Sequence, residues 1–454
     1  MAKYKAYPEY KDSGVEWLGR VPSHWEILSA KRMFQSVRTP AYKSDEQLAA
    51  SQKYGVIPQS LMMQLNDSKV MLALKGTESF RHVEANNFVI SLRSFEGGIE
   101  YSQYTGCVSP AYTVLKNSKP ISYGYYRYLL KCTPFIAALQ SSTDSLRDGK
   151  SINYEQFSAL SLPLSSVQEQ NVIAAFLDHE TAKIDNLIEK QQQLIELLKE
   201  KRQAVISYAV TKGLNPDVPM KDSGVEWLGE VPEHWKIKRC KNLFNFVTSG
   251  SRGWAGFYSD EGDLFFRIAN LTRDSINPKL DSIQYVTPPK GSEGERSKIK
   301  ENDLLISITA DLGSVCAADG SISGGYVSQH VSLCRPSRLV ASSRWLAYFV
   351  LSDTAKEQLQ GAGYGGTKVQ LSLEDIRDLF VAYPPKSEQI KIASYLDERL
   401  SDLDGLDHRA HNLIELLRER RTALISAAVT GKIDVRDWVA PGKQDVEASQ
   451  EATA

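Results

Sequence analysis

A fifteen-residue stretch occurs twice in this chain. Residues 11–25 read KDSGVEWLGRVPSHW, and residues 221–235 read KDSGVEWLGEVPEHW. The copies differ at two positions only, Arg20 against Glu230 and Ser23 against Glu233. So close a match between segments 210 residues apart indicates an internal duplication. The chain must therefore fold into two related units, and each unit must use this stretch in the same way.

The duplication extends along most of the chain. Four further pairs of blocks align: VISLRSFEGGI (89–99) with LISITADLGSV (305–315), GCVSPAYTVL (106–115) with GYVSQHVSLC (325–334), EQNVIAAFLD (169–178) with EQIKIASYLD (388–397), and LIELLKEKRQAVISYAVT (194–211) with LIELLRERRTALISAAVT (413–430). The offset is 216 for the first pair and 219 for the other three. The opening and closing blocks are almost unchanged between the copies, whereas the middle segments match at only a few short blocks.

The middle of each copy predicts a mixed α/β globular domain. Short runs rich in β-branched residues, bounded by Gly, Asn and Pro, are typical of strands joined by long loops. Such runs occur at Phe88 to Leu92, Val108 to Leu115, Leu304 to Ile308 and Val327 to Leu333. Helical stretches follow near 122–140 and 343–360.

The closing blocks predict two long helices. Apolar residues recur every three or four positions, which is the pattern of a helix with one apolar face. They are Ile173, Leu177, Ile184, Leu187, Ile188, Leu194, Leu198 and Val205 in the first copy, and Leu396, Leu403, Leu406, Leu413, Leu417 and Leu424 in the second. A helix of about forty residues is ~60 Å long. We expect the two helices to pack as an antiparallel coiled coil, with these residues in its core.

These patterns predict five segments. They are a first α/β domain at 1–160, a helix at 161–214, a second α/β domain at 215–383, a helix at 384–435 and a flexible tail at 436–454. The near-identity of the opening stretch is explained if it joins each domain to the helices. Trp17, Trp25, Trp227 and Trp235 then belong to these junctions, although tryptophans can also stack on bases.

Composition places the chain among soluble globular proteins. No secretory signal or membrane-spanning run is visible, and the five cysteines include no C-x-x-C pair, so we expect free thiols and a cytoplasmic location. The formal net charge of −1 excludes a uniformly basic nucleic-acid binder. Charge is nevertheless uneven, because residues 1–160 carry 19 Lys and Arg against 14 Asp and Glu, and residues 221–383 carry 19 against 20.

Catalytic and nucleotide-binding motifs do not match this chain. GAGYGGTK at 361–368 contains G-x-G-x-x-G, but it follows a helical pattern, and its Thr-Lys order is the reverse of a P-loop. The sequence has no H-E-x-x-H and no Asn-Pro-Pro-Tyr run, and it lacks nucleophile-elbow or triad spacing. We expect no catalysis and no metal site in this chain. The loop around Lys368, like that around Arg147 and Lys150, is better interpreted as facing DNA or solvent.

Taken together, the duplicated S-G-V-E-W-L-G…P-x-H-W stretch, the E-Q-x-x-I-A…L-D helix starts and the A-V-T helix ends resemble the specificity subunit of type I restriction–modification systems. The resemblance covers about residues 8–435. It implies two target-recognition domains on two spacer helices, each domain reading one half of a bipartite DNA site. It also implies two methyltransferase subunits and restriction subunits as partners. S-adenosylmethionine, ATP and magnesium would be bound by those partners and not by this chain.

The residues expected to contact DNA are loop residues whose side chains can read base edges or bind phosphate. Arginine reads guanine, glutamine reads adenine, and serine, threonine or tyrosine can contact phosphate. In the first copy the candidates are Arg93, Ser94, Tyr101, Gln103, Tyr104, Arg147 and Lys150. In the second copy they are Ser249, Arg252, Trp254, Tyr258, Arg267, Asn270, Arg273, Thr309, Asp311, Gln329, His330 and Lys368.

Two other hypotheses about the function remain open. A coiled-coil scaffold could join two protein-binding domains without touching DNA, and a steep salt dependence of DNA binding would distinguish a reader from such a scaffold. A self-contained restriction–methylation enzyme would need catalytic motifs that we do not find.

Overall fold

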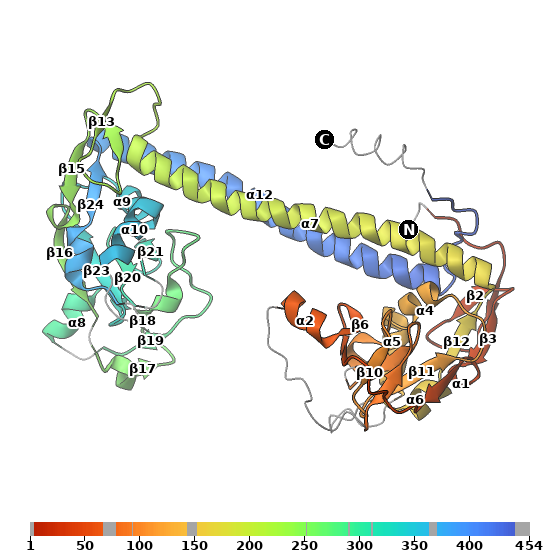
Figure 1. Cartoon of the computed structure of the whole chain (residues 1–454). Coiled ribbons are helices and arrows are strands. Elements are labelled where there is room, and N and C mark those ends of the chain that lie inside the picture. Colours follow the sequence, from red (N-terminus) through yellow and green to blue (C-terminus); the bar gives the residue numbers. More distant parts are fainter. Residues whose placement is uncertain are drawn as a thin grey trace. The chain divides into compact units, whose positions relative to one another are not determined.

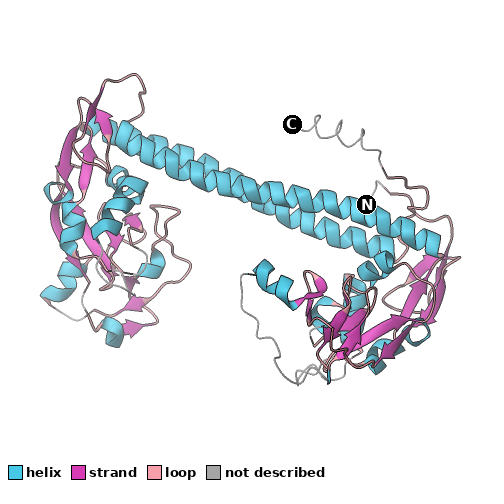
Figure 2. Ribbon diagram, in the orientation of Figure 1, coloured by secondary structure: helices cyan, strands magenta, loops and turns pink. Residues whose placement is uncertain are grey.

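The chain is described by a computed structural model that covers residues 4–66, 79–92, 94–142, 152–250, 252–288, 291–309, 312–362 and 370–440. It divides into two compact units, Met1–Gln191 with Asn412–Ala454 (unit 1) and Gln192–His411 (unit 2). Each unit contains an α/β domain and part of both long helices, α7 (Val167–Lys212) and α12 (Lys386–Val429). The mixed α/β class and the two long helices are confirmed, and Figure 2 shows helices and strands in both units.

The α/β domain of unit 1 is built on a four-stranded antiparallel sheet. Its order is β4 (Phe34–Val37), β11 (Thr113–Asn117), β8 (Phe88–Ile90) and β9 (Glu100–Tyr101). Two smaller pairs accompany it, β5 (Leu48–Ser51) with β6 (Gly55–Pro58), and β7 (Arg81–Val83) with β10 (Gly106–Val108). The domain's helices are α1 (Ala30–Met33), α2 (Gln59–Asn66), α3 (Ser94–Gly97), α4 (Tyr123–Leu129), α5 (Thr133–Ser141) and α6 (Tyr154–Ala159). Phe34, Phe88 and Tyr126 pack edge to face in its core.

Unit 2 contains an equivalent sheet and one further sheet. The equivalent sheet has the order β16 (Phe244–Ser249), β23 (Val331–Pro336), β20 (Leu304–Ser307) and β21 (Val315–Ala317). The further sheet is β17 (Tyr258–Ser259), β19 (Tyr285–Val286), β18 (Asp263–Phe266) and β22 (Tyr326–Val327), with β18 and β22 parallel. Strands β17, β18 and β19 are labelled in Figure 1. Helices of this domain are α8 (Ser292–Ser297), α9 (Ser343–Leu351), α10 (Asp353–Ala362) and α11 (Leu373–Asp378), with short 3-10 turns η3 (Cys240–Asn242), η4 (Trp254–Phe257) and η5 (Ile268–Asn270).

Strand register shows that the two domains are copies of one fold. Val89 on β8 lies opposite Val114 on β11, and Leu305 on β20 lies opposite Leu333 on β23. These pairs differ by 216 and 219 residues, the same offsets as the aligned sequence blocks. The strand pair that leads into each long helix also matches, β3 (Glu26–Ser29) with β12 (Ser161–Leu164), and β15 (Lys236–Arg239) with β24 (Phe380–Tyr383). The internal repeat is therefore structural as well as sequential.

The duplicated opening stretch forms the same junction in both units. It begins as a hairpin, β1 (Tyr10–Asp12) with β2 (Arg20–Pro22), or β13 (Met220–Asp222) with β14 (Glu230–Pro232). The hairpin is followed by a His-Trp pair at the start of the long helix. Trp25 is fully buried and donates from Nε1 to Glu169 on α7 at 3.0 Å, and Trp235, also fully buried, donates to Glu388 on α12 at 3.0 Å. The prediction that this stretch joins each domain to a helix is confirmed.

A second set of repeated contacts holds each domain against its helix. The Gln170 side chain accepts a hydrogen bond from the backbone N–H of Ser122, and Gln389 accepts one from Ala341, both at 2.8 Å. About two turns further along each helix, an aspartate pairs with an arginine and a tyrosine of the domain. The two sets are Asp178 with Arg127 and Tyr128, and Asp397 with Arg344 and Tyr348.

Each long helix ends against an opening hairpin. Lys212, at the end of α7, bonds the carbonyl of Glu230, and Lys432, beyond the end of α12, donates to the carbonyl of Leu18 at 2.9 Å. The residues that terminate these helices, Gly213 and Gly431, have φ angles of 79° and 70°. A side chain is strained in this left-handed region, and a Cβ at residue 431 would also collide with the ring of Pro22.

Within each unit the two helical segments run antiparallel. Arg421 donates to Asp185 at 2.9 Å in unit 1, and Arg202 pairs with Asp404 in unit 2. In unit 1, Glu169 and Gly431 both lie against Trp25, so the residue number rises on α7 and falls on α12 from there to Asp185 and Arg421. In unit 2, Glu388 and Gly213 both lie against Trp235, so it rises on α12 and falls on α7 from there to Asp404 and Arg202. Most of the residues predicted to form the core between the helices are buried, but the prediction is wrong for four leucines. Leu187, Leu194, Leu406 and Leu413 are 39–48% exposed, because the apolar stripe is wider than the strip that one partner helix covers.

None of the helices in the described part of the chain has a run long and apolar enough to span a bilayer. All five cysteines are buried and free.

Candidate nucleic-acid interface

Five predicted DNA contacts cannot be placed. Arg93, Arg147, Lys150 and Lys368 lie outside the described residues, as does Asp311. The remaining candidates fall into four groups, which differ in burial and in what their polar atoms bind.

One end of the main sheet in unit 2 collects five of the predicted residues. β16 and β20 end at this edge and β23 begins there, because Ser249 lies opposite Ser332 and Ser307 lies opposite Val331. The loops that follow or precede these strands therefore emerge together. We call the end of the sheet defined by Ser249, Arg267, Thr309, Gln329 and His330 the loop edge of unit 2.

Backbone hydrogen bonds bring these loops into contact. The N–H of Gly250 donates to the carbonyl of Ser328 at 3.3 Å, and the N–H of Ile308 donates to that of His330 at 3.1 Å. Ser328 in turn donates to the carbonyl of Phe266 at 2.9 Å, which places Arg267 beside the same loop. Gly250 allows this close approach, since a Cβ there would overlap the carbonyl of Val327.

The loop edge of unit 2 presents the polar groups that base reading requires. His330 is exposed, and its ring nitrogen Nε2 lies 3.0 Å from the amide nitrogen of Gln329. Arg267 is half-buried, and its Nε has no hydrogen-bond partner among the described residues. An amide and an imidazole side by side, with a guanidinium in the neighbouring segment, can bind base edges in a DNA groove.

Three predicted contacts must be corrected because their side chains are buried in the fold. Ser94 is 1% exposed, and its hydroxyl accepts a hydrogen bond from the N–H of Ser91 at 2.8 Å. Asn270 is 1% exposed and donates to the carbonyls of Lys279 and Ser282. Trp254 is 3% exposed and stacks on Phe265 at 5.9 Å. We therefore assign no DNA contact to these three side chains.

Three other predicted residues of unit 2 lie on its surface and are not among the residues that define the loop edge. Arg252 is exposed in the loop that follows β16, and Tyr258 on β17 is 45% exposed with its ring tilted against Phe265. Arg273 is exposed and donates to the carbonyl of Leu312 at 3.2 Å.

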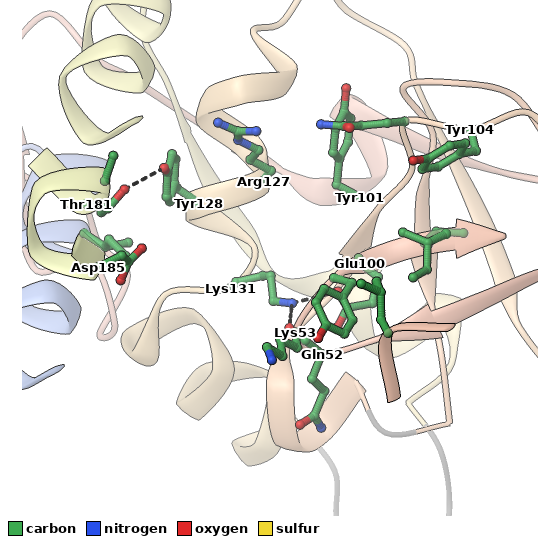
Figure 3. A pocket seen from close by; sticks show the side chains of 18 of the residues that line it. Gln52, Lys53, Glu100, Tyr101, Tyr104, Arg127, Tyr128, Lys131, Thr181 and Asp185 are labelled. Atoms are coloured by element: carbon green, nitrogen blue, oxygen red, sulfur yellow. Dashed lines mark hydrogen bonds and ion pairs between the residues drawn. The ribbon is translucent and has the colours of Figure 1, made fainter. Parts of the chain in front are cut away.

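The remaining predicted residues of unit 1, Tyr101, Gln103 and Tyr104, line a cleft of about 820 Å³ (Figure 3). The cleft lies between the β5–β6 turn, α4 and the helical segments of the unit. The hydroxyl of Tyr101 donates to Asn86 at 2.5 Å, and Tyr104 is 37% exposed. These tyrosines are accessible, but the cleft in which they lie is chemically different from the loop edge.

The cations of this cleft are largely neutralised. Lys131 donates to Glu100 and to the carbonyl of Gln52, both at 2.7 Å (Figure 3). Arg127 pairs with Asp178, and Arg421 pairs with Asp185. Burial raises the pKa of the Glu100 carboxyl, and the charge of Lys131 opposes that rise. Of these ion pairs, Arg127 with Asp178 joins the domain to α7, Arg421 with Asp185 joins the two helices, and Lys131 with Glu100 lies within the domain.

Sequence reasoning missed two arginines at the corresponding loop edge of unit 1. β4 ends at Val37, opposite Val114, and β8 ends at Ile90, opposite Thr113, so this is the same end of the sheet. Arg38 follows β4 directly, and Arg81 begins β7. Both line a cleft of about 370 Å³, together with Ser36, Thr113, Asn153, Tyr154 and Glu155. The strand repeat could have indicated Arg38, but no sequence signal connects it with Arg81.

Comparison with known proteins agrees with this architecture. The family described as type I restriction modification DNA specificity domain matches twice, at residues 22–197 and 232–416. The EcoBI specificity subunit of Escherichia coli is 21% identical over 70% of this chain and 68% of the relative. A putative MjaX specificity subunit from Methanocaldococcus jannaschii is 22% identical over 92% and 96%.

Solved structures share the fold. A chain from a study of complex assembly and conformational transition in a type I restriction–modification system matches with a TM-score of 0.70 at 14% identity, covering 91% of this chain and 99% of its own length. The HsdS subunit from Thermoanaerobacter tengcongensis matches with a TM-score of 0.56 at 15% identity, covering 91% and 98%.

Proposed function

We propose a DNA-reading function for this chain, which belongs to the family of type I restriction–modification DNA specificity proteins. It is the specificity subunit of a type I restriction–modification complex. Each α/β domain reads one half of a bipartite target, and the subunit recruits the methyltransferase and restriction subunits. We assign the two recognition domains to residues 1–160 and 215–383, with the helices at 161–214 and 384–435 as spacers and 436–454 as a tail.

The observation that carries this proposal is the repeated sheet end with different side chains in the two copies. Register is conserved between Val89 with Val114 and Leu305 with Leu333, so both domains present the same loops. At equivalent positions of these loops, unit 1 has Arg38, Pro110 and Ala111, whereas unit 2 has Ser249, Gln329 and His330. A conserved scaffold with different polar groups at one edge is what two different half-sites require.

Partner recruitment is supported by leucines that the helix pair leaves exposed. In the LIELL block of α7, Ile195 and Leu198 are buried, whereas Leu194 and Leu197 are 39% and 60% exposed. The LIELL block of α12 repeats this arrangement, with Leu413 and Leu416 exposed at 42% and 62%. Exposed apolar residues that recur at the same place in each repeat favour two copies of one protein partner. We assign these two leucine pairs to two methyltransferase subunits.

Catalysis belongs to the partners in this proposal. S-adenosylmethionine would be held by the methyltransferase subunits, and ATP and magnesium by the restriction subunits. The chain itself supplies sequence choice and assembly, and it acts in the cytoplasm. Its buried, free cysteines suit that reducing compartment; for example, burial raises the pKa of Cys132 to about 12.

The test is the retention of labelled DNA by the purified complex across a salt series. A reader that neutralises several phosphates loses affinity steeply as salt rises, and it keeps its preference for one sequence against random competitor. A scaffold that never touches DNA shows no retention above that of the partner subunits alone. The second outcome would overturn the proposal in favour of the coiled-coil scaffold.

A further inference from the structure

Two arginines at the loop edge of unit 1 lie side by side because of strand pairing. Pro40 and Arg81 form an antiparallel bridge. The N–H of His82 donates to the carbonyl of Thr39 at 2.8 Å, and the N–H of Ala41 donates to that of Phe80 at 2.9 Å. This short ladder sets Arg81 next to the segment that begins with Arg38, although the two residues are 43 positions apart in the sequence.

The guanidinium groups of both arginines lack acidic partners. Neither makes a hydrogen bond or an ion pair with any other described residue, whereas Arg335 pairs with Asp303 and Arg344 pairs with Asp397. Glu155 lines the same cleft but is exposed and forms no ion pair with them within the described part. Burial lowers the pKa of Arg81, and the positive charge of Arg38 lowers it further. Two like charges held this close are unfavourable unless an anion joins them.

The cleft offers space and further donors for such an anion. Its volume is about 370 Å³, and the hydroxyl groups of Ser36 and Thr113 face it without a hydrogen bond to any described residue. A phosphodiester has two charged oxygens that accept several hydrogen bonds at once, which matches two guanidinium groups and hydroxyl donors. The edge of a guanine engages the fork of a single arginine. The arrangement therefore favours phosphate over a base.

We propose that Arg38 and Arg81 together bind one phosphate of the DNA backbone and so position the first half-site against unit 1. This inference rests on the DNA-reading function proposed above. It makes both arginines positioning residues that carry no base preference themselves. The clamp is specific to the first repeat, because Val37 pairs with Val114 and Thr248 pairs with the equivalent Leu333, which places Ser249 where unit 1 has Arg38. It also accounts for part of the positive charge concentrated in residues 1–160.

The test uses the full chain in complex with its methyltransferase subunits, with the variants Arg38→Gln, Arg81→Gln and the double variant. Arg32→Gln is the matched control, because Arg32 on α1 is exposed and its replacement removes the same charge from the same unit. Each single variant should bind target and random DNA roughly tenfold more weakly, the loss expected for a hydrogen bond to a charged group. The slope of log affinity against log salt should fall by about one in the double variant, while the selected bases stay the same.

Several results would overturn the clamp. If a variant loses its preference at one base pair, the arginine contacts a base. If a variant loses no more affinity than Arg32→Gln, the effect reflects only the net charge of the unit. Free protein should melt no lower in the single variants than in the wild type, because repulsion between the arginines is relieved. A lower melting temperature would instead assign them a structural role. Stabilisation of the wild type by millimolar inorganic phosphate, lost in the double variant whose DNA binding is unchanged, would assign the cleft to a free anion.

The outcome for the clamp is separable from that for the proposed function. If the wild-type complex itself shows no salt-dependent and sequence-selective binding, the DNA-reading function fails. If the wild type binds selectively and the variants behave like Arg32→Gln, only the clamp fails.

Discussion

The indole Nε1 of Trp25 donates a hydrogen bond of 3.0 Å to the carboxylate of Glu169, which follows it by 144 residues. The same carboxylate accepts from the hydroxyl of Tyr7 at 2.8 Å and lies 2.9 Å from Nε2 of His24. Trp235 and Glu388 repeat the relationship in unit 2. One carboxylate thus holds the opening stretch against the first turn of each helix, which explains why that stretch has changed so little between the copies.

Replacing this acceptor should destabilise unit 1 more than unit 2. Glu169→Ala leaves the buried donors of Tyr7 and Trp25 without an acceptor, at a cost of about 1–3 kcal/mol for each group that stays dry. Glu388→Ala is the matched control. Its carboxylate is 33% exposed against 6% for Glu169, so water can replace more of what is lost. Urea unfolding followed by tryptophan fluorescence measures both, and an equal or larger loss for Glu388→Ala would contradict this account of the junction.

The ion pair of the buried Glu100 with the half-buried Lys131 predicts a pH dependence of stability. Burial raises the pKa of the Glu100 carboxyl. Below the ordinary glutamate pKa of about 4.3 the carboxyl is neutral in both the folded and the unfolded chain. As pH rises further, the unfolded chain releases the proton more readily than the folded chain, so stability falls until the folded pKa is passed.

Glu100→Gln removes this titration. Relative to the variant, the wild type should therefore be more stable near pH 4 than near pH 7, as measured by urea unfolding at both values. The difference between the two pH values matters here, since the substitution also removes the ion pair with Lys131. A wild type that gains stability over the variant with rising pH would show that Lys131 outweighs burial.

The exposed leucine pairs should control assembly with partner subunits. Leu197→Glu and Leu416→Glu each place a charge on one proposed docking site, and both positions are at least 60% exposed, so folding should be little affected. Each single variant should bind one methyltransferase subunit and the double variant none, as counted by native mass spectrometry. Lys201→Glu, exposed on the same helix, is the control. Full assembly of the double variant would place the partners elsewhere.

The repeat, the junctions and the paired helices could be predicted from the sequence because identical residues encode identical contacts in both copies. Which leucines of the helices are exposed could not be predicted from the sequence. A spacing of three and four residues predicts an apolar face, but it does not say that Leu198 faces the partner helix while Leu194 does not. That distinction depends on how wide a strip one helix can cover.

The loop edges were only partly predictable for a related reason. Residue type indicated Gln329 and His330 correctly as surface groups, yet it also selected Asn270, whose amide serves two backbone carbonyls inside the fold. Arg38 and Arg81 were missed because strand register, rather than sequence distance, brings them together. Polar residues in loops look alike in a sequence whether they bind the chain's own backbone or face outward.

The most direct test of the central claim is the DNA motif selected from a random library by the complete complex. The wild type should select two specified blocks separated by an unspecified gap. Gln329→Ala with His330→Ala, at the loop edge of unit 2, should remove information from one block and leave the other unchanged. A continuous motif in the wild type, or a loss spread over both blocks in the variant, would contradict the claim that each domain reads its own half of the target.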